Sequence, residues 1–75
     1  MSVKSSLAER QALASRHVDT GRQIVERQRR LVARIRSRGY DSASAESLLS
    51  SFERSLAVFE DDLVQLMKRS PETTG

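Results

Sequence analysis

The residue most capable of chemistry in this 75-residue chain is its single histidine, His17. An imidazole can transfer protons, act as a nucleophile or bind a metal, but each role needs further groups nearby. The chain has no cysteine, no glycine-rich loop, and no serine with a base other than His17. We therefore predict that the protein is not an enzyme and has no catalytic residues, metal or cofactor.

The segment Arg16-His17-Val18-Asp19-Thr20-Gly21 resembles one family that uses a lone histidine. Histidine phosphotransfer domains are helical bundles with an exposed histidine and a glycine four residues later. The resemblance implies a phosphoryl group on His17 and a docking surface beside Gly21, although Thr20 stands where the family has a basic residue. The alternative is a structural histidine at the edge of a helical bundle, hydrogen-bonded or ion-paired with Asp62.

The elements that position His17 are two helices separated by Gly39. Apolar residues recur at helical spacing and predict helices over residues 3–38 and 42–69, with a turn at 39–41. A glycine just after a helix favours a left-handed conformation, and Asp41 or Ser42 can cap the next helix. Pro71 predicts a disordered tail over residues 70–75. The predicted fold is all-α, a single antiparallel two-helix hairpin over residues 1–75.

The short turn sets which residues of the two helices lie opposite each other. Facing core positions should have residue numbers that sum to about 80, which places Gly21 opposite Phe59 and Gln28 opposite Phe52. Because protein interiors are densely packed, we interpret Gly21 as a notch for the Phe59 ring. One edge of the hairpin is predicted to form the ion pairs Arg36–Glu46, Arg29–Glu53 and Arg22–Glu60.

The opposite edge is a second, weaker apolar stripe that a two-helix hairpin cannot bury. We predict that two hairpins pack through this stripe into a homodimeric four-helix bundle, or that it binds another bacterial regulatory protein. The predicted function is a non-enzymatic protein–protein interaction or regulatory module. The predicted interface residues are Leu13, His17, Ile24, Leu31, Leu48 and Val58.

Charge is distributed unevenly, with +7 in residues 1–38 and −4 in residues 39–75, which together give the net +3. Opposite charges favour pairing of the two helices first, and only the surplus is available to outside partners. The arginines left over predict nucleic-acid binding as an alternative function, with Tyr40 the nearby aromatic residue and Glu26 close to Arg30. The candidate contacts are Arg27, Arg30 and Arg34.

No apolar run approaches the roughly 20 residues of a membrane span, and no signal peptide is recognisable, so we expect a cytoplasmic protein without membrane contact. The chain resembles short, uncharacterised bacterial helical-hairpin proteins. This resemblance implies the hairpin fold and a bacterial origin, without an activity. The residues that show it are His17, Gly21, Ile24, Gln28, Ile35, Gly39, Asp41, Ala45, Leu48, Leu49, Phe52 and Leu56.

Overall fold

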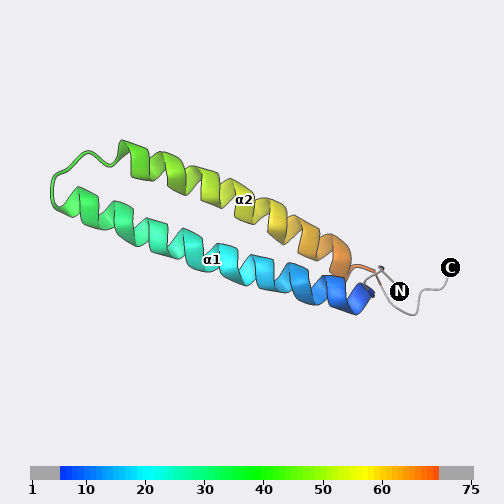
Figure 1. Ribbon diagram of the computed structural model, residues 1–75. Coiled ribbons are helices and arrows are strands. Elements are labelled where there is room, and N and C mark those ends of the chain that lie inside the picture. Colours follow the sequence, from blue (N-terminus) through cyan, green and yellow to red (C-terminus); the bar gives the residue numbers. More distant parts are fainter. Residues whose placement is uncertain (1–5, 70–75) are drawn as a thin grey trace, which may run out of the picture.

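The computed structural model describes residues 6–69 as two antiparallel helices joined by a turn (Figure 1). Helix α1 comprises Leu7–Ser37 and helix α2 comprises Ala43–Met67, which confirms the predicted all-α hairpin. The molecule is 14 Å deep in its shortest direction. A helix with its side chains is about 10–12 Å wide, so the hairpin is one helix thick. Side chains on both broad faces are therefore open to solvent.

Helix α1 begins at a capping box. The Ser6 hydroxyl accepts a hydrogen bond from the Glu9 amide at 3.0 Å, and the Glu9 carboxylate accepts one from the Ser6 amide at 2.9 Å. Ser6 has extended backbone angles, so the helix starts at Leu7 and not near residue 3 as predicted. Residues 3–5 and the predicted tail over residues 70–75 lie outside the described part of the chain.

Helix α1 ends in a Schellman motif. The Gly39 amide donates to the Arg36 carbonyl at 2.9 Å, and the Tyr40 amide donates to the Ile35 carbonyl at 3.1 Å. Gly39 has φ +76°, a conformation that an L side chain rarely adopts, so the predicted left-handed glycine is confirmed. The connection covers residues 38–42 and is one residue wider at each end than predicted, because the flanking residues act as helix caps.

Ser42 occupies the N-cap position of helix α2, but the hydrogen bond to the first turn comes from Asp41, one residue earlier. Its Oδ1 atom accepts from the Ala43 amide at 3.0 Å. The Ser42 hydroxyl instead donates to the Glu46 carboxylate, which also pairs with Arg36 at 2.9 Å. The hydrogen bonds from Ser42 and then Arg36 hold the pKa of Glu46 below its ordinary value. An ionised carboxylate thus links the two helices beside the turn.

Three valines of α1 form the buried apolar core between the helices. Val18, Val25 and Val32 are 1%, 3% and 6% exposed, whereas no residue of α2 is fully buried. Complete burial of a valine contributes about 1.5–3 kcal/mol relative to an exposed one. Three such residues make a small core for a chain of this length. Most apolar side chains of α2 therefore lie only partly covered in a single hairpin.

Two glutamines of α1 donate hydrogen bonds to the backbone of α2. The buried Gln28 side chain donates to the Ala45 carbonyl at 2.9 Å, closer to the turn than the predicted position opposite Phe52. Gln11 donates to the Leu66 carbonyl at 2.8 Å near the other end of the hairpin. Among residues 6–69, no buried side-chain nitrogen or oxygen lacks a hydrogen bond. These bonds make the partly polar seam compatible with burial.

Gly21 lies where a side chain of α2 approaches the backbone of α1. A Cβ atom at this position would lie 3.1 Å from Leu56 Cδ1 and 3.9 Å from Phe59 Cδ2. The predicted proximity of Phe59 is therefore present, but Leu56 is the nearer neighbour. Gly21 provides a notch that both side chains share, rather than one for the aromatic ring alone.

We expect Gly21→Leu to lower the melting temperature because the new side chain overpacks this notch. Overpacking costs about 1–3 kcal/mol, which exceeds the gain of about 1 kcal/mol from replacing a helical glycine. Each kcal/mol of net loss lowers the melting temperature by about 4–8 °C in a domain of this size. Thermal unfolding followed by circular dichroism measures it, with Ser15→Leu at an exposed α1 position as control. Equal melting temperatures for wild type and Gly21→Leu would contradict the notch.

Candidate interaction surface

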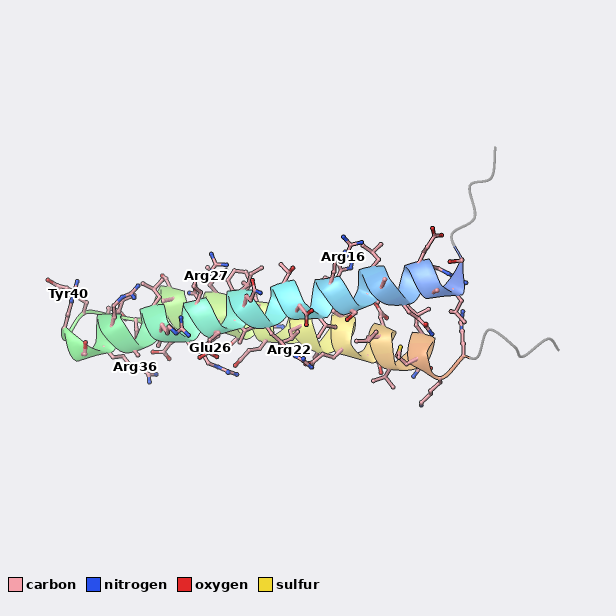
Figure 2. The ribbon with its side chains drawn as sticks, turned by 90° about the horizontal axis from the view of Figure 1, so that it is seen from below. Arg16, Arg22, Glu26, Arg27, Arg36 and Tyr40 are labelled. Carbon is pink, nitrogen blue, oxygen red and sulfur yellow. The ribbon has the colours of Figure 1, made fainter. Side chains whose placement is uncertain are left out.

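One edge of the hairpin is a row of ion pairs between α1 and α2, here termed the ion-pair edge. All three predicted pairs are confirmed, and Figure 2 shows Arg22 and Arg36 extending to the same side of α1. Their side chains are 41–63% exposed, so each pair contributes only about 0.2–1 kcal/mol. The row fixes the alignment of the helices more than it stabilises them. The pairs are Arg36–Glu46 at 2.9 Å, Arg29–Glu53 at 3.1 Å and Arg22–Glu60 at 3.3 Å.

The opposite edge, termed the open edge, contains the six residues predicted as an interface. Within residues 6–69, no ion pair joins the helices along it. Leu13, Leu48 and Val58 are 48%, 47% and 60% exposed, respectively, and two aliphatic residues beside them are half-buried. The hairpin thus covers one side of these residues and leaves the other in water. The open edge consists of Leu13, His17, Ile24, Leu31, Leu48 and Val58.

Sequence reasoning missed two exposed apolar residues at the end of α2. Val64 and Met67 are 50% and 61% exposed. They follow the last ion pair of the ion-pair edge, at outward positions of the α2 heptad. Each directly follows a leucine of the α2 core stripe, Leu63 or Leu66, so periodicity assigns the core position to the leucine and gives no reason to assign the next residue to an interface. Their position on the other side of α2 makes them useful controls for the open edge.

An open groove of about 590 Å³ lies at the end of the hairpin away from the turn. Apolar side chains from both helices line it, together with two arginines and one carboxylate. The groove is continuous with the open edge because Leu13 and His17 belong to both. Its lining residues are Arg10, Leu13, Ala14, His17, Phe59, Asp62, Gln65, Leu66 and Arg69.

His17 packs on Phe59 instead of pairing with Asp62. The two rings have centroids 5.4 Å apart and an interplanar angle of 46°, a tilted arrangement that is favourable for aromatic pairs. No ion pair within residues 6–69 includes His17, so the predicted His17–Asp62 ion pair is wrong, although both residues line the groove. The His17 ring is exposed and extends the apolar surface of Phe59.

The environment of Gly21 argues against the resemblance to phosphotransfer domains. In those domains the glycine clears space for a docking protein beside the histidine. Here the space at Gly21 is taken by Leu56 and Phe59 from the same chain. Packing within the hairpin is therefore a sufficient reason for a glycine four residues after His17.

The three arginines proposed to contact nucleic acid lie exposed on α1. Figure 2 shows Arg27 extending to the opposite side of the helix from Arg22 and Arg36. Glu26, which was expected to lie close to Arg30, forms an ion pair with Arg29 at 3.8 Å. In the described part of the chain, no acidic group lies within 4 Å of the three arginines. This basic group consists of Arg27, Arg30 and Arg34.

Residues 6–69 contain neither a candidate metal site nor a candidate membrane span. No group of three or more histidine, aspartate or glutamate side chains there could hold a metal ion. Neither helix has the length and apolarity needed to cross a membrane. No protein-family model matches the chain, and neither the curated proteins nor the solved structures compared with it include a match. The resemblance to bacterial helical-hairpin proteins stays a prediction.

Proposed function

We propose that the protein is a non-enzymatic interaction module in which two hairpins associate through their open edges into a four-helix bundle. The observation that supports this proposal is the contrast between the two edges. Charges along the ion-pair edge are matched within one chain, whereas aliphatic side chains along the open edge remain about half exposed. An apolar band of this kind is typical of an interface.

The small core gives a second reason to expect a second copy. Among residues 6–69, only three apolar residues are buried, and α2 contributes none of them. Small domains commonly obtain the missing burial by association, and a two-fold pair of hairpins covers the same surface on both chains. The six residues of the open edge include no arginine, lysine, aspartate or glutamate, although Arg27 and Arg34 of α1 lie beside them.

The test compares two valine substitutions on opposite sides of α2. We expect Val58→Glu to convert a dimer into a monomer, whereas Val64→Glu leaves the dimer intact, because only Val58 belongs to the open edge. The two valines are 60% and 50% exposed, so the intrinsic effects on the hairpin are closely matched. Sedimentation equilibrium over a dilution series measures the mass. A monomeric wild type, or equal dissociation by both variants, would contradict the proposal.

Nucleic-acid binding is a second candidate, supported by the absence of acidic partners near Arg27, Arg30 and Arg34 among residues 6–69. We expect any duplex binding to weaken steeply with salt, because arginines release counterions from phosphates. Replacing the three arginines with glutamine should abolish it, whereas replacing Arg22 and Arg29, which are ion-paired, should have a smaller effect. Fluorescence anisotropy with a labelled duplex at 20 and 200 mM salt measures this, and no binding at low salt would exclude this function.

A further inference from the structure

We infer that the two hairpins pair with their turns at the same end, so that each α1 lies on α2 of the other chain. This inference rests on the proposed dimer and adds the relative orientation of its two copies. A two-fold axis parallel to the helix axes gives this arrangement. A two-fold axis perpendicular to the helix axes would instead stack α1 on the partner's α1 and α2 on the partner's α2. All neighbouring helices are antiparallel in both arrangements, so helix direction does not distinguish them.

Charge favours the first arrangement. Helix α1 contains eight arginines and three acidic residues, and α2 contains one arginine and five acidic residues. Three arginines of α1 and three glutamates of α2 are already paired along the ion-pair edge, which leaves a net +2 on α1 and −1 on α2. Placing α1 on α2 of the partner surrounds every helix with neighbours of opposite charge. The perpendicular axis instead brings Arg27 and Arg34 of both chains along the same contact. Like charges across an interface disfavour a wrong arrangement.

Side-chain size favours the same arrangement. Along the open edge, α1 presents the large side chains of Ile24 and Leu31, with Arg27 between them in the sequence. Helix α2 presents the small side chains of Ser51 and Ser55 between Leu48 and Val58. Leu31 opposite the small side chain of Ser51 fills the interface toward the density of a protein interior, whereas stacking α2 on α2 places serines near one another.

The register of the hairpin aligns the apolar residues of the two copies. Ile24 and Val58 both lie between the Arg22–Glu60 and Arg29–Glu53 ion pairs, and so at the same height along the hairpin. Leu31 and Leu48 likewise lie between the Arg29–Glu53 and Arg36–Glu46 pairs. With the turns together, Ile24 meets Val58 of the partner in an apolar layer. By the same alignment, Leu31 lies opposite Ser51 of the partner, about three residues from Leu48 along α2.

A distance between spin labels at the turn separates the two arrangements. The chain has no cysteine, so Tyr40→Cys introduces one labelling site, at a turn residue that is 68% exposed. With the turns at the same end, we expect the two labels within about 25 Å, since packed helices lie 8–10 Å apart. The perpendicular axis separates them by about 45 Å, the length of a 31-residue helix at 1.5 Å per residue.

Gln23→Cys is the matched control, because it lies near the middle of α1 and gives a short distance in both arrangements. Double electron–electron resonance on the full-length protein measures both variants, with sedimentation to confirm their mass. A distance near 45 Å for Tyr40→Cys, with a short one for Gln23→Cys, would overturn the orientation and leave the dimer. A monomeric mass with no label coupling would overturn the proposed function itself.

Discussion

Replacing Val25 with aspartate should unfold the chain at neutral pH. Val25 is 3% exposed and lies between the other two buried valines along α1. The substitution removes about 1.5–3 kcal/mol of apolar burial and also places a carboxylate in the buried valine seam, where it loses its hydration. The combined cost is above about 4 kcal/mol. That is comparable to the entire stability of a 75-residue chain, about 4–11 kcal/mol at 0.05–0.15 kcal/mol per residue.

Far-UV circular dichroism measures the loss of helix in Val25→Asp. Gln23→Asp is the control, because it introduces the same residue two positions earlier, where the side chain is exposed. We expect this control to keep nearly all of its helical signal. A folded Val25→Asp protein that melts near the wild-type temperature would show that the valine seam does not hold the helices together.

The turn and the ion-pair edge could be predicted from the sequence because both depend on local or periodic patterns. Gly39 ends helix α1 in a left-handed backbone conformation, and its position in the sequence determines which residues of α1 and α2 face each other. The ion pairs follow from this register, since arginine and glutamate side chains are long enough to tolerate a small error in alignment. Agreement of three pairs along one edge therefore tests the fold more strongly than any single contact.

The start of α1 was predicted too early although its signal is present in the sequence. Ser6 and Glu9 have the spacing of a capping box, and the structure contains both of its hydrogen bonds. Apolar periodicity extends past this signal toward residue 3, so periodicity alone predicts a start that is too early. At the start of α2, Asp41 and Ser42 are both good caps, and the choice depends on Glu46, whose partner Arg36 comes from the other helix.

Core contacts were predicted less accurately than the ion pairs. Gly21 lies nearest Leu56, and Gln11 binds the carbonyl of Leu66, so these residue numbers sum to 77 rather than 80. The rule that facing residue numbers sum to about 80 assumes a symmetric turn. The real connection has a Schellman motif at the end of α1 and a capping residue at the start of α2, and these two ends differ in geometry. With this offset Leu56 takes the position nearest Gly21, while Phe59 lies beside it and packs against His17.

Replacing both Ile24 and Leu31 with glutamate should remove the concentration dependence of thermal stability. If hairpins are stable mainly as pairs, dissociation and unfolding are coupled, and dilution favours the unfolded chain. Each tenfold dilution then weakens the wild-type dimer by about 1.4 kcal/mol. For an assembly of this size, we expect the melting temperature to fall by about 3–6 °C per tenfold dilution. The double variant should melt at a lower temperature that does not change with concentration.

Ser47→Glu with Ala57→Glu is the control, because it adds two carboxylates at exposed positions of α2 away from the open edge. This control should keep the wild-type slope of melting temperature against concentration. The slope of the wild type is informative even if the double variant is unfolded, since it depends only on the coupling of folding to association. A wild-type melting temperature that is constant over a hundredfold dilution would mean that three valines suffice to hold a single hairpin. The open edge would then be a surface for a different protein.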